Sequence, residues 1–456
     1  MNPLVDEIDE PTPAGISAAL GRLISSGRLA PGARLPTVRQ LAGDLGVSPA
    51  TVSHAWQAVS AAGLIVSRGR SGTFVSERAQ EWLPARSKVM AGRRVDSRID
   101  LSRGIPDPEL LPALGPALSR ISERAVTSSY QDLPVIPGLL DVLQESWPYP
   151  VDSITVVNGA LDAISRSLDE VVRFGDRVII ENPTFPPFYD LLDQLGVERL
   201  PVPVDQHGLE PSAFAAALAK GPSAVILQPR AHNPTGASMT AARAEQLARM
   251  LQDDPRAAKT IVIEDDHSGQ ISTADDVSIG QWLPERVLHV RSYSKSHGPD
   301  LRIAALGGSA ALVNRVVARR MLGPGWTSRM LQTILHDLLV DERSVAQVAR
   351  ARDEYATRQH ELAEALSQLG VTTGPADGIN TWLAVEDEHE AMLQLAASGI
   401  RVAGGTPFLA VDENQQPHVR VTVGAIRGEV REIAAALAAT AAPRSAADRA
   451  PGARWA

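Results

Sequence analysis

The chain has 456 residues, which is too long for one ordinary domain, and 44% of them are hydrophobic, enough for a sizeable core. It contains no cysteine, which excludes disulfides, thiolate metal sites and cysteine nucleophiles. The net charge of −9, taken alone, argues against binding to nucleic acid.

The charge changes sign along the N-terminal part. Residues 1–10 hold four acids and no base. This stretch lacks the apolar core of a signal peptide, and no apolar run reaches the ~18 residues of a membrane span, so we expect a cytoplasmic protein. Residues 28–94 hold ten Arg or Lys and three Asp or Glu. Such a basic block is typical of a nucleic-acid-binding module, but an exposed charged face would give the same count.

A compact pattern of short helices occupies residues 12–76. The segment AGISAALGRLISSG predicts the first helix, and two more follow around a tight turn. Ser48 can cap the third helix through its hydroxyl, and Pro49 suits the first helical position. The apolar stripe of this helix leaves Thr51 and His54 on its outer face, near the N-terminus. A recognition helix meets base edges and phosphates at that end.

The segment GLIVSRGRSGTFV then predicts two strands around a basic tip, a hairpin that can enter a minor groove. The string PGARLPTVRQLAGDLGVSPATVSHAWQAVSAAGLIVSRGRSGTFV resembles the winged helix-turn-helix DNA-binding domain of the GntR family over its whole length. The resemblance implies a double-stranded DNA operator as partner. Many relatives have a basic residue at Pro49 or His54, which leaves the DNA sequence open. The residues expected to face DNA are Thr37, Arg39, Ser48, Thr51, His54, Arg68 and Gly72.

Residues 77–99 show weak periodicity and many charges, which predicts a linker, and a second domain is expected over residues 100–441. Residues 442–456 read as a disordered tail. In the second domain short apolar runs alternate with helical segments, which is typical of a parallel sheet covered by helices. The expected class is α/β, with a smaller C-terminal α+β part. The predicted strands contain ITVV, RVIIE, AVILQP, TIVIEDD and RVLHV.

The motif RSYSKSHGPDLR follows one of these strands. Lys295 can form a Schiff base with an aldehyde cofactor, and burial lowers its pKa. The Ser292 hydroxyl and the Arg302 guanidinium can hold a phosphate dianion. Serine and lysine are common in loops, so this motif alone does not decide the chemistry.

Other predicted strands end in residues that suit the same cofactor. Asp265 can keep a pyridinium nitrogen protonated, although a helix cap or a metal site would also use a carboxylate. Asn233 can bond a phenolic oxygen and Phe185 can stack on a ring, with a turn and a core position as the alternatives. The backbone N–H groups of Ala160 and Leu161 stand between a strand and a helix, where they suit an anion.

Arg420 lies on the otherwise apolar strand PHVRVTVG. A buried, unpaired arginine is costly, so an anionic ligand or a structural salt bridge is expected there. Together, five strand-end motifs in this order resemble fold-type I aminotransferases over about residues 100–440.

This resemblance implies pyridoxal 5′-phosphate (PLP) as cofactor and Lys295 as the lysine that forms the aldimine. It implies Asp265 at the ring nitrogen, Asn233 at the ring oxygen, Phe185 on the ring, Ser292, Arg302, Ala160 and Leu161 at the phosphate, and Arg420 at an effector carboxylate. Tyr130 resembles the tyrosine that reaches the cofactor phosphate of the partner subunit. His267 stands where the family usually has a tyrosine near the ring oxygen, and Leu161 where many enzymes have a hydroxyl. These departures put efficient transamination in doubt.

A GntR-like domain joined to an aminotransferase-like domain resembles the MocR subfamily of regulators. The resemblance implies a head-to-tail, domain-swapped homodimer whose effector is PLP or its adduct with an amine or amino acid. The segments PRAHNPTG, EDDH and SKSHGPDLR resemble members linked to vitamin B6 salvage. The alternative is an active aminotransferase with a secondary DNA-binding module. No metal site is expected.

Overall fold

The computed structural model describes residues 5–8, 10–61, 64–76, 84, 86–87, 97–124, 129, 132–410 and 416–442. The chain divides into two compact units. One contains residues 1–88 together with the short segments 173–176 and 187–198, and the other contains the remaining residues. No helix in the described part of the chain is long and apolar enough to cross a membrane.

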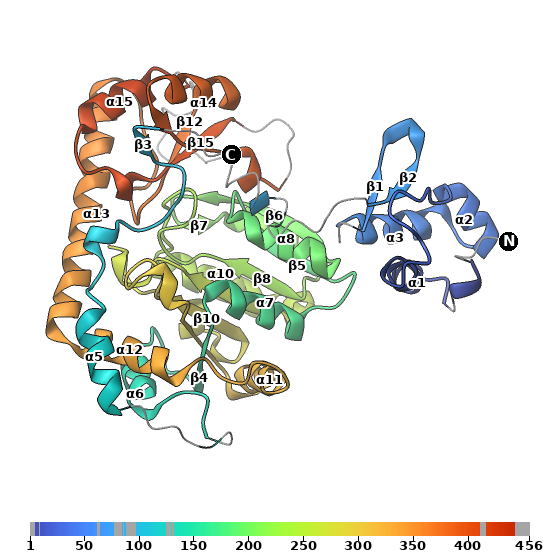
Figure 1. The fold of residues 1–456 in the computed structure, drawn as a ribbon, viewed down its shortest axis with the longest axis horizontal. Helices are drawn as coiled ribbons and strands as arrows, with labels where there is room; N and C mark the ends of the chain where they lie inside the picture. The colour runs from blue at the N-terminus through green and yellow to red at the C-terminus, as the bar shows by residue number, and fades with distance from the viewer. Residues whose placement is uncertain are drawn as a thin grey trace. The chain divides into compact units, whose positions relative to one another are not determined.

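The N-terminal module consists of three helices and a hairpin (Figure 1). Its elements are α1 (Pro13–Ser25), α2 (Val38–Leu45), α3 (Pro49–Ala61), β1 (Ile65–Ser67) and β2 (Thr73–Val75), with β1 antiparallel to β2. Val52, Ala55, Trp56 and Val59 of α3 pack into one apolar cluster with residues of α1 and α2. This arrangement confirms the predicted winged helix-turn-helix.

Local capping residues fix the helix-turn-helix. The Thr37 hydroxyl accepts a hydrogen bond from the Gln40 backbone N–H at 3.2 Å, and the Gln40 side chain bonds back to the Thr37 N–H at 3.0 Å. The Ser48 hydroxyl likewise accepts from the Thr51 N–H at 3.2 Å. These three bonds satisfy N–H groups that lack partners at a helix start. The predicted cap at Ser48 is confirmed.

A sheet of eight strands forms the centre of the second unit, in the order β4-β11-β10-β9-β8-β5-β6-β7. The pairs β5–β8, β8–β9 and β9–β10 are parallel, whereas β11 is antiparallel to both neighbours. The mainly parallel sheet and its five predicted strands are confirmed. The strands are β4 (Ser153–Val157), β5 (Arg177–Asn182), β6 (Glu198–Asp205), β7 (Gly208–Leu209), β8 (Ala224–Leu227), β9 (Ile261–Asp266), β10 (Val287–Ser292) and β11 (Ala304–Gly308).

Helices cover this sheet, and a smaller part with helices of its own follows it in the chain (Figure 1). The helices are α5 (Gly115–Arg124), α6 (Pro137–Glu145), α7 (Ala160–Val171), α8 (Pro186–Leu195), α9 (Pro211–Leu218), α10 (Ala241–Asp253), α11 (Ala310–Met321), α12 (Arg329–Val340), α13 (Glu342–Gln368), α14 (Glu388–Ala397) and α15 (Val430–Ala438). Buried apolar residues of the sheet and of its covering helices form one large core cluster, which includes Val156, Val225 and Leu247.

The smaller part contains a three-stranded sheet in the order β12 (Thr381–Ala384), β15 (His418–Val421) and β14 (Ala403–Gly404). A second, short pairing joins β3 (Ile99–Asp100) to β13 (Ile400–Arg401) in parallel. The first residues of the second domain are therefore part of its C-terminal α+β part. This part has its own apolar core, which includes Leu101, Leu383 and Val421.

Candidate cofactor and DNA-binding sites

The predicted cofactor residues gather where the parallel strands end. Asp265 is the penultimate residue of β9, Ser292 is the last residue of β10, and Asn233 and Phe185 follow β8 and β5. Parallel strands present their carboxyl ends at one edge of a sheet, and ligands of open α/β sheets bind beyond that edge. The topology explains why residues so far apart in sequence share one site.

A short backbone segment connects the two cations of the site. The Lys295 ammonium donates to the Gly104 carbonyl at 2.5 Å, and Arg420 donates to the Ser102 carbonyl at 2.6 Å. Gly104 has φ +59°, and a Cβ there would lie 3.0 Å from an Arg420 nitrogen, so a side chain at this position would be strained and crowded. Arg420 also donates to the Asn233 amide oxygen at 3.2 Å. Asn233 keeps its NH₂ group for another acceptor.

Burial and neighbouring charges change the pKa of the central groups. Burial lowers the pKa of Lys295 to about 8, and the Arg420 guanidinium acts in the same direction. Burial raises the pKa of Asp265 to about 8, with Asp266 and Glu181 adding to the effect and Lys295 opposing it. Burial also lowers the pKa of Arg420 to about 10. A lysine with this pKa supplies a neutral amine near physiological pH.

Three buried polar atoms of predicted site residues have no hydrogen-bond partner among the described residues, namely Asp265 Oδ1, His267 Nδ1 and Arg420 Nε. A protonated ring nitrogen would satisfy the Asp265 carboxylate. Burial, together with Lys295, lowers the pKa of His267 to about 3, which keeps its imidazole neutral. Its other nitrogen, Nε2, lies 3.1 Å from the Ser268 hydroxyl. A neutral imidazole has one N–H donor and one acceptor, so it can bond a ring oxygen. These residues fit PLP.

Two of the residues predicted to bind phosphate, Ala160 and Leu161, follow the turn between β4 and α7. Gly159 has φ +104°, and a Cβ there would lie 3.1 Å from an Arg302 nitrogen. Arg302 is exposed and donates to the Asn158 carbonyl at 3.4 Å. Helix α7 begins at Ala160. The backbone N–H groups of its first turn have no acceptor within the helix and can bind an anion. Ser292 pairs with Ala304, two residues beyond Arg302, which places all the predicted phosphate residues in one region.

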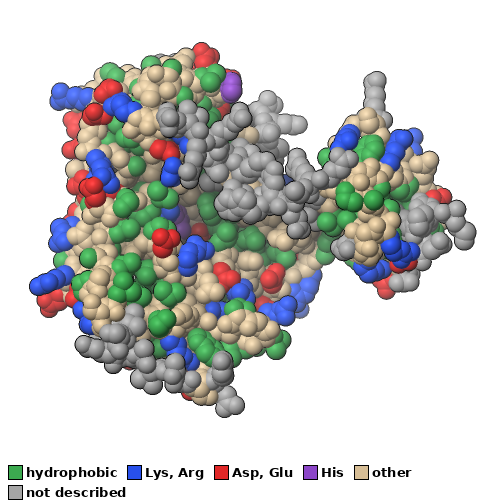
Figure 2. Space-filling model, viewed as in Figure 1, with side chains coloured by type: hydrophobic (Ala, Val, Ile, Leu, Met, Phe, Trp, Pro, Cys, Tyr) green, Lys and Arg blue, Asp and Glu red, His purple; other side chains and the backbone are tan. Residues whose placement is uncertain are grey.

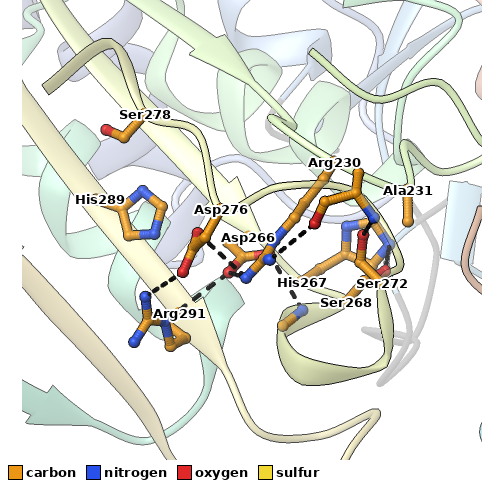
Figure 3. Close-up of polar contacts among 12 residues, drawn as sticks. Arg230, Ala231, Asp266, His267, Ser268, Ser272, Asp276, Ser278, His289 and Arg291 are labelled. Carbon is orange, nitrogen blue, oxygen red and sulfur yellow. Dashed lines mark hydrogen bonds and ion pairs between the residues drawn. The ribbon is translucent and has the colours of Figure 1, made fainter. Parts of the chain in front are cut away.

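The sequence analysis did not predict a network of charged residues that includes Asp266, on the face of β9 opposite Asp265 (Figure 3). Arg230 makes a two-bond ion pair with Asp266, at 3.0 and 2.7 Å. Asp276 accepts from Arg291 at 2.7 Å and lies 3.2 Å from Arg230. Although burial alone would raise it, Arg230 holds the pKa of Asp266 well below its usual range. Since Arg230 precedes the Asn233 turn and Asp266 follows Asp265, this pair fixes both cofactor segments to each other.

The same network includes a group with metal-ligand geometry. Asp266, Asp276 and His289 offer ligand atoms within 4.8 Å of one another. Both carboxylates are already bound by guanidinium groups, and two fixed positive charges repel a metal ion. The His289 Nδ1 atom lies 2.7 Å from a carboxylate oxygen of Glu264, within hydrogen-bond distance. The network therefore stabilises the carboxyl end of β9 from the face opposite Asp265.

The N-terminal module presents most of its predicted DNA contacts to solvent. Thr37, Arg39, Ser48, His54 and Arg68 are exposed, whereas Thr51 and Gly72 are half-buried. Figure 2 shows Lys and Arg side chains on the surface of this module.

Several of these residues also have structural contacts. The Ser48 and Thr51 hydroxyls are 2.9 Å apart, and Arg68 lies over the Phe74 ring, 5.2 Å from its centroid. A Cβ at Gly72 would lie 3.0 Å from Arg34. Arg34, a basic residue beside the wing, was not predicted. Tyr130 falls outside the described residues.

Comparison with known proteins agrees with this organisation. Residues 96–437 match the family "Aminotransferase class I and II", and residues 13–75 match "Bacterial regulatory proteins, gntR family". The chain is 35% identical to the vitamin B6 salvage pathway transcriptional repressor PtsJ of Salmonella typhimurium, over 88% of this chain and 92% of the repressor. It is 28% identical to the probable rhizopine catabolism regulatory protein MocR of Rhizobium meliloti, over 82% and 79%.

Solved structures share the fold of the second domain. The α-aminoadipate aminotransferase LysN of Thermus thermophilus, complexed with N-(5′-phosphopyridoxyl)-L-leucine, aligns with a TM-score of 0.65 at 21% identity, over 74% of this chain and 92% of the enzyme. The kynurenine aminotransferase of Pyrococcus horikoshii aligns with a TM-score of 0.67 at 19% identity, over 79% and 95%. With a GntR-family domain followed by an aminotransferase class I and II domain, this chain belongs to the MocR-type transcription regulators.

Proposed function

We propose that this regulator binds DNA in response to PLP held by Lys295, and that it controls vitamin B6 metabolism. The observation that carries the proposal is the buried Asp265 oxygen without a partner, in electrostatic contact with a lysine whose pKa is lowered. PLP supplies an electrophilic aldehyde and an electron-withdrawing ring. The similarity to the B6 salvage repressor supports the choice of PLP itself as the signal.

Each predicted residue has a distinct task in this proposal. Lys295 presents a neutral amine, and Asp265 keeps a proton on the ring nitrogen. The remaining tasks belong to Asn233 and His267 at the ring oxygen, Phe185 on the ring face, Ser292, Arg302, Ala160 and Leu161 at the phosphate, and Arg420 at an effector carboxylate. Arg420 is fully buried and has no carboxylate partner among the described residues, which leaves it free to bind an amino acid that reacts at the same site.

We also propose a head-to-tail homodimer. Large apolar side chains are exposed just before α5 and on it, before α6, at the end of α11 and just after it, and on α12, and Leu322 is 82% exposed. Exposed apolar side chains that form a contiguous patch mark protein interfaces, and we propose that these residues form one. The residues are Leu114, Leu118, Leu133, Met321, Leu322 and Met330. In this dimer, ligand binding would change the closure of the C-terminal α+β part, and residues 77–99, which lie mostly outside the described residues, would pass that change to the DNA modules.

A DNA titration tests the regulator. Purified protein is added to labelled DNA from upstream of its own gene and its neighbours, without cofactor and then with PLP, and fluorescence anisotropy is followed at fixed salt. We expect specific binding whose affinity changes with PLP. Specific binding whose affinity is the same with and without PLP would contradict PLP as the signal and would point to an amine as the effector. Absence of specific binding would contradict the regulator.

An aminotransferase is the second candidate, because Lys295, Asp265, Asn233 and Arg420 form a complete set for amino-acid chemistry. Turnover of an amino acid with an oxo acid at an ordinary rate, ~1–1000 per second, would support it. The imidazole of His267 in place of a phenol argues for slower turnover. Its lowered pKa keeps the ring neutral, and the N–H of a neutral imidazole is a weaker acid than a phenol.

Uptake of PLP by cofactor-free protein is expected to rise with pH and to level off above pH 8. Only the neutral Lys295 amine attacks an aldehyde, and the pKa of about 8 makes it scarcer by about tenfold for each pH unit below that value. Asp265 ionises over the same range and acts in the same direction. Stopped-flow absorbance measures the rate. Arg420→Met should move the profile to higher pH, since Arg420 lowers the pKa of Lys295; an unmoved profile would show that Arg420 has no such influence.

A further inference from the structure

Two described residues of the linker, Arg86 and Ser87, contact helix α8. The Arg86 guanidinium carbon lies 4.4 Å from the centroid of the Tyr189 ring, within the distance of a cation–π interaction. The backbone N–H groups of Arg86 and Ser87 donate to the Asp190 carboxylate, and successive N–H groups of this kind can form an anion-binding site. Residues 86–88 and 187–198 belong to one compact unit. The linker is therefore bound to two neighbouring residues of one helix.

Burial and charge both favour this contact. The Tyr189 side chain is fully buried, and Arg86, Ser87 and Asp190 are half-buried. Burial and the nearby Asp193 raise the pKa of the Asp190 carboxyl, whereas the two linker N–H groups and the Arg86 guanidinium oppose the rise. The linker thus supplies the groups that stabilise the charged form of this carboxylate.

Helix α8 begins directly after a residue predicted to contact the cofactor ring. Phe185 precedes Pro186, the first residue of the helix. Tyr189 and Asp190 follow Phe185 by four and five residues, which corresponds to about 6 Å along a helix axis. Rigid secondary elements carry energetic coupling between sites. A displacement of Phe185 therefore reaches the linker contact through little more than one turn of helix.

The segment before α8 is also bonded to the C-terminal α+β part. The Thr184 N–H donates to the Phe408 carbonyl at 2.9 Å, and the Ala410 N–H donates to the Asn182 side-chain oxygen at 2.9 Å. The Arg420 guanidinium lies over the Phe408 ring, 5.0 Å from its centroid. Residues 182–185 are thus placed to respond both to a ligand at Phe185 and to a ligand at Arg420.

We propose that Tyr189 and Asp190 form the docking site through which the cofactor-binding domain controls the linker, and hence DNA affinity. The inference rests on the proposed function, which places the PLP ring on Phe185. When PLP binds, residues 182–185 change position and α8 follows. The contact with Arg86 and Ser87 then differs in free energy between the two states, as coupling requires. A chain without this contact still binds PLP and DNA, but neither ligand affects the other.

Hydrogen–deuterium exchange tests the docking site itself. Full-length, cofactor-free wild type is compared with Asp190→Ala and with the control Gln194→Ala, which changes an exposed residue of the same helix. The backbone amides of Arg86 and Ser87 should exchange tenfold faster or more in Asp190→Ala, because their acceptor is lost. Gln194→Ala should leave their exchange as in the wild type.

A DNA titration with and without PLP tests the role of the docking site. Fluorescence anisotropy gives the dissociation constant for the upstream fragment under both conditions, and absorbance gives the affinity for PLP. In Asp190→Ala and Arg86→Met the ratio of the two DNA dissociation constants should fall to within twofold of one. The affinity for PLP should stay within twofold of the wild-type value, and Gln194→Ala should keep the wild-type ratio.

The possible outcomes separate this proposal from the proposed function. Unchanged exchange at Arg86 and Ser87 in Asp190→Ala would overturn the docking site, and a wild-type ratio of DNA dissociation constants in both variants would overturn its role. Loss of PLP binding in both variants would also contradict it. If Asp190→Ala does not fold, Arg86→Met decides. Wild-type protein that binds PLP without any change in DNA affinity would instead refute the proposed function, and the exchange measurement would still decide whether the docking site exists.

Discussion

Lys295→Ala protein is expected to lose both the visible absorbance of bound PLP and the effect of PLP on DNA affinity. The side chain lies in the site, its ammonium bonds the Gly104 carbonyl, and its pKa is lowered to about 8, so no other described lysine can replace it. DNA binding itself should persist, because the N-terminal module has a core of its own. Absorbance spectra and anisotropy titrations measure the two properties.

The matched control for that variant is Lys259→Ala, which removes an exposed lysine outside the cofactor site. It should keep the absorbance and the PLP response of the wild type. If Lys295→Ala still changed its DNA affinity with PLP, the lysine would not be the point at which the signal enters, and the proposed mechanism would be wrong.

Asp265→Asn is expected to weaken PLP binding by about 100-fold or more, as for removal of one partner from a buried charge pair. An asparagine has almost the same shape as the aspartate but carries no charge to hold a proton on the ring nitrogen. The buried Oδ1 atom has no other described partner, so the described residues offer no substitute for the carboxylate. Equilibrium titration of cofactor-free protein gives the affinity.

Asp275→Asn serves as the control, since Asp275 is exposed and ten residues further along the chain. Its PLP affinity should equal that of the wild type. An Asp265→Asn protein that binds PLP as tightly as this control would show that another group pairs with the ring nitrogen.

The sequence was sufficient to predict elements whose signal is local. The cap at Ser48 and the buried strands β4, β5, β8, β9 and β10 follow from residue type and periodicity, and the structure confirms them. Lys295, Asp265 and Asn233 could be found because each follows or ends such a strand, and parallel strands bring their carboxyl ends together.

Other features depend on contacts between distant segments. Arg230 and Asp266 pair across 36 residues, and Arg320 meets Val156 across 164. Neither arginine lies in a motif, so nothing local marks it. The adjacent acids Asp265 and Asp266 could have indicated the ion pair, because successive strand residues point to opposite faces and the second acid therefore needs a buried partner of its own. The requirement for glycine at Gly104 could not be predicted, because it depends on the approach of Arg420.

Strand β3 has a further consequence for how the chain transmits force. It pairs with β13, and the residues that follow it bond to β15 and its end: the Ser102 carbonyl accepts from Arg420, and the Leu101 carbonyl accepts from the Thr422 N–H at 2.8 Å. Residues 99–102 are thus anchored beside Arg420, the residue proposed to bind an effector carboxylate. In mechanical terms, a displacement of Arg420 would reach β3 directly through the Ser102 carbonyl, without crossing the large sheet.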